Sequence, residues 1–385
     1  MGADRSIDKS IDKSIDKNIN KNINKNIKES SVCGKNYSYV LKGTISEDAK
    51  FGNVIINILP EAMEKAGFKL GDSCDVIFEK GGCVTDVPYY NGYYSKRGNP
   101  ILVAYPGFKY INIGYNGLRI WDDLELEEGE PVTVALNESG KYIEVQETFN
   151  QNYSCVREEY DSNEAFCNFR ALKGGRIKDN FFFRGTSPIN NCRCRAANTD
   201  KLIEKSGIKY IANLADTKDE IEEYLKEADF ASPYAASLYE SGKIYCANMG
   251  ISYTGSEFKD KLVAMLREMV RHEGPMYIHC LEGKDRTGYV CAVLEALAGA
   301  SYEELSRDYM MTYRNYYSVD KDNTKMKYDA IEDLYFKEFL RYLHNAEVTS
   351  ELETADYSTD AVNYLIGAGM TDKEIELIKA YLTDC

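Results

Sequence analysis

A cysteine and an arginine separated by five residues lie within residues 277–289, which read YIHCLEGKDRTGY. A cysteine beside cationic groups at a helix N-terminus has its thiolate favoured, so Cys280 is a candidate nucleophile at neutral pH. Five intervening residues are enough for backbone N–H groups to ring a tetrahedral oxyanion, and the planar guanidinium of Arg286 can hold two of its oxygens. The spacing therefore predicts phosphoryl transfer through a cysteinyl-phosphate.

The other residues of this loop suit the same chemistry. Gly283 and Gly288 would allow positive φ values and a close approach of backbone to an anion. The Thr287 hydroxyl is expected to hydrogen-bond the thiolate and so lower the pKa of the thiol. An inert buried cysteine and a solvated lysine are the alternatives for Cys280 and Lys284. The predicted phosphate-binding residues are Leu281, Glu282, Gly283, Lys284, Thr287 and Gly288.

The sequence around the loop predicts the elements that position it. Residues 257–271 have the pattern of an amphipathic helix, residues 276–278 form a short apolar run typical of a buried strand, and residues 289–294 are an apolar helix. The loop would then lie between a strand and a helix N-terminus, where unpaired N–H groups and the helix dipole favour an anion.

His279-Cys280, five residues, then Arg286-Thr287 resemble the signature of the cysteine-dependent protein tyrosine phosphatase superfamily. The Gly-Lys-Asp-Arg-Thr-Gly form is most similar to bacterial tyrosine or dual-specificity phosphatases and to phosphoinositide phosphatases. An aspartate directly before the arginine also resembles the myotubularin-type lipid phosphatases. The resemblance implies an α/β domain with a central, mostly parallel sheet flanked by helices.

Further segments carry the same resemblance. Residues 168–175 are similar to the Asn-Phe-Arg-Asp-Leu-Gly-Gly entry of the family, with Ala171 where an aspartate is usual. Residues 181–187 match its strand that ends in Arg-Gly, and residues 308–312 resemble the segment after its active-site helix. Asn213 and Ala215 depart from the Asp-Leu-Arg of related phosphatases. A helix over 200–206 and a strand over 208–214 have the spacing of a βαβ unit.

The leaving oxygen needs a general acid. Asp285 occupies the position proposed for the acid in myotubularin-type enzymes. Asp216 follows a predicted strand, at the edge where active-site loops gather in open α/β sheets. Asp216 could instead cap a helix over 218–226, and Asp219 is a weaker third candidate. We favour Asp285 slightly and expect His279 to bond backbone carbonyls and tune Cys280 rather than act as a base.

Composition limits the partners and the surroundings. The net charge of −15 argues against nucleic acid or an anionic membrane as a general partner. Because no apolar run approaches the length of a membrane span, stable membrane insertion is not expected. The 11 cysteines show no pairing pattern, and with three histidines and no Cys-x2-Cys pair no metal is expected. No cofactor is predicted. A thiolate nucleophile favours a reducing compartment, so a cytoplasmic location is predicted, with secretion open if a leader was removed.

The chain before the phosphatase-like part divides into three predicted segments. Residues 1–35 contain a four-residue repeat over 6–28, whose isoleucines drift around a helix, so we predict a disordered tail, or else a coiled-coil or surface-binding segment. Residues 36–150 are predicted as a mostly-β, barrel-like domain, and acidic residues 151–165 as a linker to a catalytic domain over 166–385. The predicted strands are 37–41, 53–58, 75–78, 101–105, 131–136 and 142–145, with a helix over 60–66.

Parts of this β region, residues 51–58 with Gly71-Asp72 and residues 126–132, resemble the C-terminal β-barrel of S-adenosylmethionine hydrolases and halogenases. The catalytic domain of that family has no counterpart in this sequence, so no adenosyl chemistry is carried over. A scaffold or a module binding an unknown partner is expected.

Three functions stay open from the sequence. The first is hydrolysis of phosphomonoesters, with a phosphorylated protein, phosphotyrosine above all, as substrate; the Lys284-Asp285 pair keeps phosphoinositides or inositol phosphates open. The second is a phospho-ligand binding module that has lost turnover, which the altered positions 171, 213 and 215 would explain. The third makes the tail and the β domain a tethering device.

Overall fold

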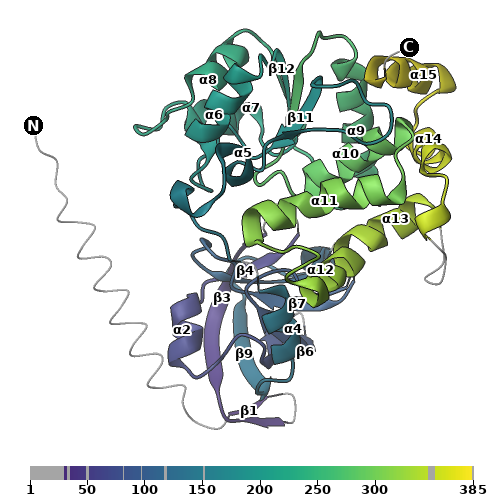
Figure 1. Ribbon diagram of the computed structural model, residues 1–385. Helices are drawn as coiled ribbons and strands as arrows, with labels where there is room; N and C mark the ends of the chain where they lie inside the picture. The colour runs from purple at the N-terminus through teal and green to yellow at the C-terminus, as the bar shows by residue number, and fades with distance from the viewer. Residues whose placement is uncertain are drawn as a thin grey trace, which may run out of the picture. The chain divides into compact units, whose positions relative to one another are not determined.

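The computed structural model describes residues 30–32, 35–48, 52–80, 82–96, 98–116, 119–150, 152–345 and 352–383. The repeat at 6–28, predicted as a tail, lies outside these residues. The chain forms two compact units, Met1–Gln151 and Asn152–Cys385 (Figure 1). Residues 152–165, predicted as a linker, thus belong to the second unit, where the short helices η1 (Arg157–Glu159) and α5 (Asn163–Phe166) form.

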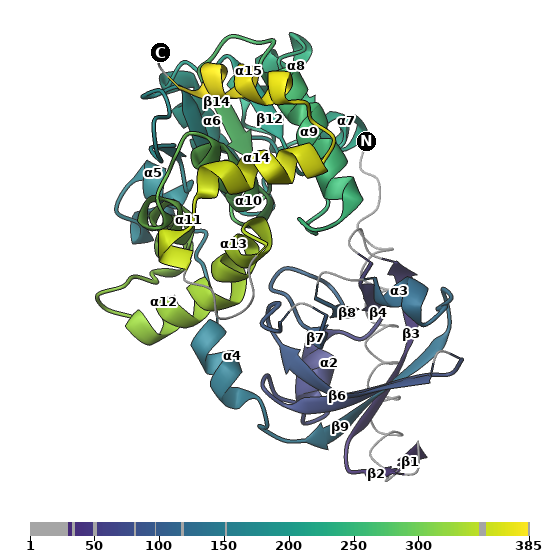
Figure 2. The ribbon, with the colours of Figure 1, turned by 90° about the vertical axis from the view of Figure 1, so that its right-hand side faces the viewer.

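The first unit is a closed barrel, which confirms the predicted barrel-like domain (Figure 2). Neighbouring strands are antiparallel except β6 and β7, which run parallel. The barrel encloses apolar side chains that alternate along the strands, such as Val54 and Ile56. Its strands, in barrel order, are β3 (Val40–Asp48), β4 (Val54–Ile56), β8 (Ile111–Tyr115), β7 (Pro100–Val103), β6 (Gly82–Tyr90), β5 (Ser73–Phe78) and β9 (Pro131–Glu138). The other elements are the hairpin β1 (Ser30–Val32) and β2 (Lys35–Tyr37), and helices α2 (Pro60–Lys65), α3 (Ile120–Asp123) and α4 (Ile143–Phe149).

One predicted strand of this unit is wrong, and others, β1 among them, were missed. Residues 142–145 begin helix α4 rather than a strand. The buried side chains of α4 are Gln146 and Phe149, three positions apart, which is a helical period. Phe149 stacks on Tyr94 with 5.7 Å between ring centroids, so tertiary packing outweighs the β propensity of Ile143 and Val145. Strands β6 and β8 were not predicted.

The second unit contains a five-stranded sheet in the order β10-β11-β14-β12-β13. Only β10 is antiparallel to its neighbour; the other four strands are parallel, so their carboxyl ends share one edge. This confirms the predicted α/β domain with a mostly parallel sheet. The strands are β10 (Arg170–Ala171), β11 (Phe182–Gly185), β12 (Tyr210–Asn213), β13 (Ile244–Cys246) and β14 (Met276–His279).

Helices cover both faces of this sheet, with α6 (Ala196–Lys205) and α8 (Pro233–Glu240) on one side and α9 (Ser256–Met269), α10 (Asp285–Leu297) and α14 (Tyr357–Gly367) on the other (Figure 1). All four residues of β14 and nearly every residue of α10 are buried, because strand and helix lie in the centre of the unit. The remaining helices are α7 (Lys218–Tyr224), α11 (Tyr302–Tyr317), α12 (Lys325–Ile331), the π-helix η2 (Glu332–Lys337), α13 (Glu338–Leu343), η3 (Leu352–Thr354) and α15 (Asp372–Leu382). Capping boxes at Ser301 and Thr371 start α11 and α15.

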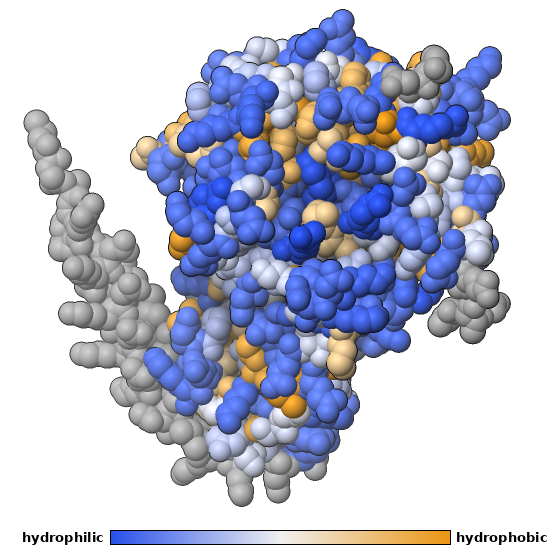
Figure 3. Space-filling view, viewed as in Figure 1, coloured by the Kyte–Doolittle hydropathy of each residue, from blue (hydrophilic) through white to orange (hydrophobic). Residues whose placement is uncertain are grey.

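The surface is mostly hydrophilic on the face seen in Figure 3, where hydrophobic residues are exposed in small patches. Scattered apolar side chains of this kind are ordinary on a folded chain. In the part of the chain that the structure describes, no helix is both long and apolar enough to span a membrane.

Candidate active site

The loop that follows β14 lies at the carboxyl edge of the sheet, between the neighbouring strands. The Leu214 N–H donates to the His279 carbonyl oxygen at 2.8 Å, and the Ser187 N–H donates to that of Leu281 at 3.1 Å. Cys280 therefore emerges from the central strand between the segments that follow β11 and β12. Helix α10 begins at Asp285, four residues earlier than predicted, so Arg286 stands in its first turn.

Gly283 adopts φ of +68° and packs against β11. A Cβ at this position would lie 2.2 Å from the Gly185 carbonyl oxygen, so only glycine fits. Gly288 is different from what we predicted, because it is helical and has no positive φ. Its need for glycine comes from Tyr309, whose ring would lie 2.7 Å from an added Cβ.

Two side chains from outside the loop hold its carbonyl groups. Asn168 Nδ2 donates to the carbonyl oxygens of Glu282 and Gly283 at 3.2 and 3.3 Å, and Arg184 Nη2 donates to that of Gly283 at 2.7 Å. In a planar trans peptide the carbonyl and the following N–H point in opposite directions. The N–H groups of Gly283 and Lys284 therefore point away from Asn168 and Arg184, as an anion cradle requires.

Arg184 is fully buried and shares the carboxylate of Asp308 on α11 with Arg170. Arg170 Nε donates to Asp308 Oδ1 at 2.6 Å, and Arg184 Nη1 pairs with Oδ2. Burial alone would raise the pKa of Asp308, but the two guanidinium groups hold it below its usual value. The carboxylate is thus ionised and balances the charge next to the loop.

His279 contacts the loop backbone, as expected. Its Nδ1 lies 3.0 Å from the Cys280 carbonyl oxygen, and the ring is fully buried. Burial lowers the pKa of His279 to about 4, with a smaller contribution from Arg286 in the same direction. At neutral pH the ring is therefore uncharged and can donate Nδ1–H to that carbonyl.

Cys280 and Arg286 lie at opposite ends of the loop. Cys280 is 4% exposed. Arg286 Nη1 donates to the carbonyl oxygens of Leu214 and Met249, at 3.4 and 3.3 Å, in the segments after β12 and β13. The predicted bond from Thr287 to Cys280 is not formed: among the described residues, the buried Thr287 Oγ1 has no hydrogen-bond partner.

The two candidate acids have different surroundings. The Asp285 side chain is 31% exposed at the start of α10. Loss of water raises the pKa of Asp285 and Glu282 adds to this, while Lys284 and Arg286 oppose it. Asp216 is buried at 5% exposure, and its Oδ2 accepts a hydrogen bond from Asn213 Nδ2 at 3.0 Å. Asp219, the third candidate, lies in the first turn of α7.

The ammonium group of Lys284 lies beside two acidic side chains. Its ammonium lies 3.6 Å from Glu282 and 3.9 Å from Asp285, and its side chain is 10% exposed. It also lies 5.5 Å from the centre of the Tyr317 ring. Lys284 was predicted to add charge for a phosphate; its ammonium lies beside two carboxylates, and the contact with a phosphate stays a prediction.

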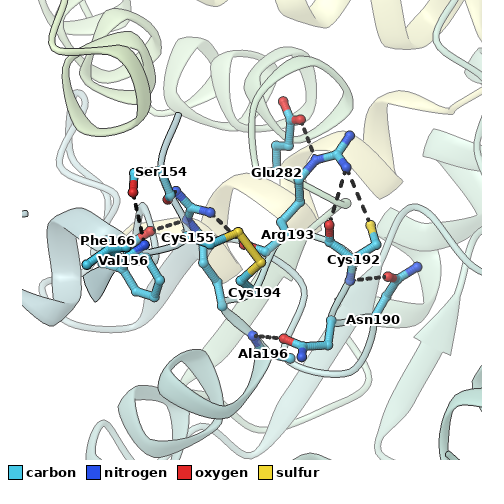
Figure 4. The surroundings of a disulfide bond; sticks show 12 residues. Ser154, Cys155, Val156, Phe166, Asn190, Cys192, Arg193, Cys194, Ala196 and Glu282 are labelled. Carbon is cyan, nitrogen blue, oxygen red and sulfur yellow. Dashed lines mark hydrogen bonds and ion pairs between the residues drawn. A yellow bond between two sulfur atoms is a disulfide. The ribbon is translucent and has the colours of Figure 1, made fainter. Parts of the chain in front are cut away.

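The structure corrects our reading of the cysteines. Cys155 and Cys194 form a disulfide across 39 residues, although the sequence showed no pairing pattern (Figure 4). Within the described residues, no cluster of three or more His, Cys, Asp or Glu side chains is arranged to hold a metal ion. Cys192, two positions before Cys194, is an exposed free thiol.

Sequence reasoning did not assign four residues that support the loop: Asn168, Arg184, Arg193 and Asp308. Arg193 Nε donates to Glu282 Oε1 at 2.8 Å, and both side chains are at least nine-tenths buried. Three of them lie in the segments that resemble the family, 168–175, 181–187 and 308–312, and Arg184 is also a charged residue inside an apolar run, after three phenylalanines. Such a residue is buried only when paired.

Comparison with known proteins gives one family and two solved structures. A model described as the tyrosine phosphatase family matches residues 162–384. A structure titled as an uncharacterized conserved protein from Thermotoga maritima is 17% identical, with a TM-score of 0.22; the match covers 24% of this chain and 35% of that chain, about a third of its length. The core catalytic domain of the PP-IP phosphatase SIW14 from S. cerevisiae, in complex with citrate, is 20% identical, with a TM-score of 0.26; that match covers 44% of this chain and 92% of the other. No curated protein matches the chain.

Proposed function

Because the chain belongs to the tyrosine phosphatase family, whose members are cysteine-dependent phosphatases, we propose that it hydrolyses phosphate monoesters through a cysteinyl-phosphate on Cys280. The observation that carries this proposal is the loop itself. Cys280 and Arg286 flank a turn whose carbonyls are tied outward by Asn168 and Arg184, at the N-terminus of the buried helix α10.

The reaction has two steps. In the first, Cys280 Sγ attacks phosphorus, the bond to the ester oxygen breaks, and a general acid protonates the leaving oxygen. In the second, a water molecule attacks phosphorus, the S–P bond breaks, and the carboxylate formed in the first step accepts the proton of the water. Arg286 and the loop N–H groups would stabilise the charge on the phosphoryl oxygens in both steps.

We assign the general acid to Asp285. Its raised pKa keeps more of the carboxyl protonated near neutral pH, and its partial exposure allows contact with a leaving group. The Asp216 carboxylate is buried and already accepts a hydrogen bond from Asn213. Asp216 therefore suits a role in shaping the turn next to Arg286.

The charge balance of the loop favours a substrate with a single phosphate, phosphotyrosine in a protein above all. A head group with several phosphates binds more tightly where the site has cationic side chains in excess. Here Glu282 lies against both Lys284 and Arg193, so its carboxylate offsets part of their charge. Phosphoinositides are the alternative substrates of the proposal.

The test is hydrolysis of a small aryl phosphate, without metal and with a monothiol to keep Cys280 reduced. We expect wild type to turn over, Cys280→Ser to fall to background, and vanadate to inhibit. Asp285→Asn should lose about 100-fold or more in kcat, and Asp216→Asn less. An inactive wild type that still binds vanadate would instead identify a binding module. A panel of phosphotyrosine peptides and phosphoinositides then decides the substrate class.

A further inference from the structure

Arg193 lies between the phosphate loop and a disulfide, two features that the proposed mechanism does not connect. Figure 4 shows its side chain reaching Glu282, while the following residue, Cys194, is bonded to Cys155. The phosphate loop is therefore linked to the start of the second unit through one side chain and one covalent bond.

The contact between Arg193 and Glu282 is a buried ion pair. Arg193 Nε lies 2.8 Å from Glu282 Oε1, and the two side chains are 8% and 7% exposed. Tyr317 Oη donates to the other oxygen of Glu282 at 3.3 Å, and Lys284 lies 3.6 Å from it. A buried carboxylate that loses a charged partner must move or take up a proton. Because Glu282 is part of the phosphate loop, either change alters the loop.

The backbone that carries Arg193 is held in an unusual conformation. Cys194 has φ of +61°, a region that residues with a side chain rarely adopt. The Cys194 N–H bonds the Asn191 carbonyl oxygen at 2.8 Å, and the disulfide fixes the same residue with a Cα–Cα distance of 5.5 Å. The disulfide thus holds the turn in which Arg193 faces Glu282.

We propose that Arg193 is a positioning residue for the phosphate loop and that the Cys155–Cys194 disulfide keeps it paired with Glu282. The inference rests on the proposed function, since it concerns the same loop. Reduction of the disulfide by a dithiol transfers two electrons and two protons to the pair, giving two thiols and the oxidised dithiol. Reduction then releases the turn and weakens substrate binding without any change at Cys280.

The first experiment is a double-mutant cycle with Arg193→Gln and Glu282→Gln, read by the vanadate inhibition constant and by KM and kcat for an aryl phosphate. Arg193→Gln should weaken vanadate binding by about 10- to 100-fold. The double variant should lie within about threefold of Glu282→Gln alone, because the two side chains act as one pair. Arg193→Lys keeps the charge and should recover part of the loss.

Cys192→Ser is the matched control, because serine can still accept the hydrogen bond that Arg193 Nη1 donates to Cys192 Sγ, and the disulfide stays in place. It should keep the wild-type vanadate affinity. Cys155→Ser removes the disulfide from its distant end and should weaken vanadate binding about threefold or more. In the Arg193→Gln background it should have no further effect. Mass mapping of the Cys155–Cys194 peptide verifies the disulfide in each sample.

The redox arm compares a monothiol with a dithiol. Dithiol treatment should weaken vanadate binding by wild type to the level of Cys155→Ser and leave that variant unchanged. Because Cys280 is reduced under either reagent, the difference reports on the disulfide. Additive effects of Arg193→Gln and Glu282→Gln, or equal vanadate affinity with and without the disulfide, would overturn the inference. A wild type that neither turns over nor binds vanadate would refute the proposed function instead, and thermal unfolding of each variant separates both outcomes from misfolding.

Discussion

Asn213 holds the turn after β12 with both ends of its side-chain amide. Its Oδ1 accepts from the N–H groups of Ala215 and Asp216 at 2.9 and 3.1 Å, as an aspartate would. Its Nδ2 also donates to Asp216 Oδ2, which an aspartate could not do. The departure of Asn213 from the family pattern therefore preserves the turn beside Arg286, and it gives no reason to expect a loss of turnover.

At the same scale, we predict that His279 makes the protein less stable in acid. Its pKa is about 4 in the folded protein and 6.5 ordinarily, so the unfolded chain binds the proton more tightly. The contribution of the neutral His279 ring to the free energy of unfolding is fully present above pH 6.5, and it is lost as the pH falls from 6.5 to about 4. The difference corresponds to roughly 3 kcal/mol.

Urea unfolding of wild type and His279→Asn at pH 7 and pH 4.5 measures this effect. The variant should lose less stability than wild type between these two values, since it has no proton to bind at this position. Equal losses in the two proteins would show that His279 does not titrate in the unfolded chain with its ordinary affinity or is charged when folded.

At the scale of elements, Asp308 joins helix α11 to strand β11 and to the phosphate loop. It pairs with Arg170 and Arg184, and Arg184 in turn holds the Gly283 carbonyl. We expect Asp308→Asn to lower the free energy of unfolding by about 3–5 kcal/mol, because it leaves a buried arginine without its counter-charge. Activity should fall as well, since Arg184 also supports the loop.

The matched control for this prediction is Asp333→Asn. Asp333 pairs with Arg341 at 3.1 Å but is 57% exposed, so its loss should cost less than about 1 kcal/mol. Denaturant unfolding compares the two variants. Similar small losses of unfolding free energy in both variants would mean that the buried network contributes little to stability. Some proteins do keep their stability when a buried ion pair is replaced by hydrophobic residues.

At the scale of the whole molecule, the two units have separate buried cores. Ile113 belongs to the core of the barrel, and Ile211 to a core of the phosphatase unit. We predict two unfolding transitions in calorimetry. Ile113→Ala should lower the stability of one unit by about 2–5 kcal/mol and leave aryl phosphate hydrolysis unchanged, whereas Ile211→Ala should affect the other transition and reduce activity.

A single transition that both variants shift equally would contradict this prediction. The measurement also bears on the third function considered from the sequence, in which the barrel is the working part. If the barrel unfolds first while hydrolysis persists, its role is separate from the chemistry of the loop.

The sequence alone determined the class of fold and located the loop between β14 and α10 to which we assign the chemistry. Cys280, Gly283 and Arg286 are close along the chain, so their spacing already carries the geometry of an anion cradle. The apolar runs of β12 and β14 are local patterns as well, and both strands were predicted correctly. Local hydrogen bonds and the periodicity of apolar residues depend on residues that are close in sequence, so they can be predicted without a structure.

Only the tertiary structure decided what surrounds the loop. Asn168 is 115 residues from Gly283, Arg184 is 124 from Asp308, and Arg193 is 89 from Glu282. The disulfide, the position of Lys284 beside Glu282 and the helical state of α4 likewise depend on packing. The physical reason is that a buried charge or a half-buried helix is stable only beside its partner, and the fold determines which distant segments become neighbours.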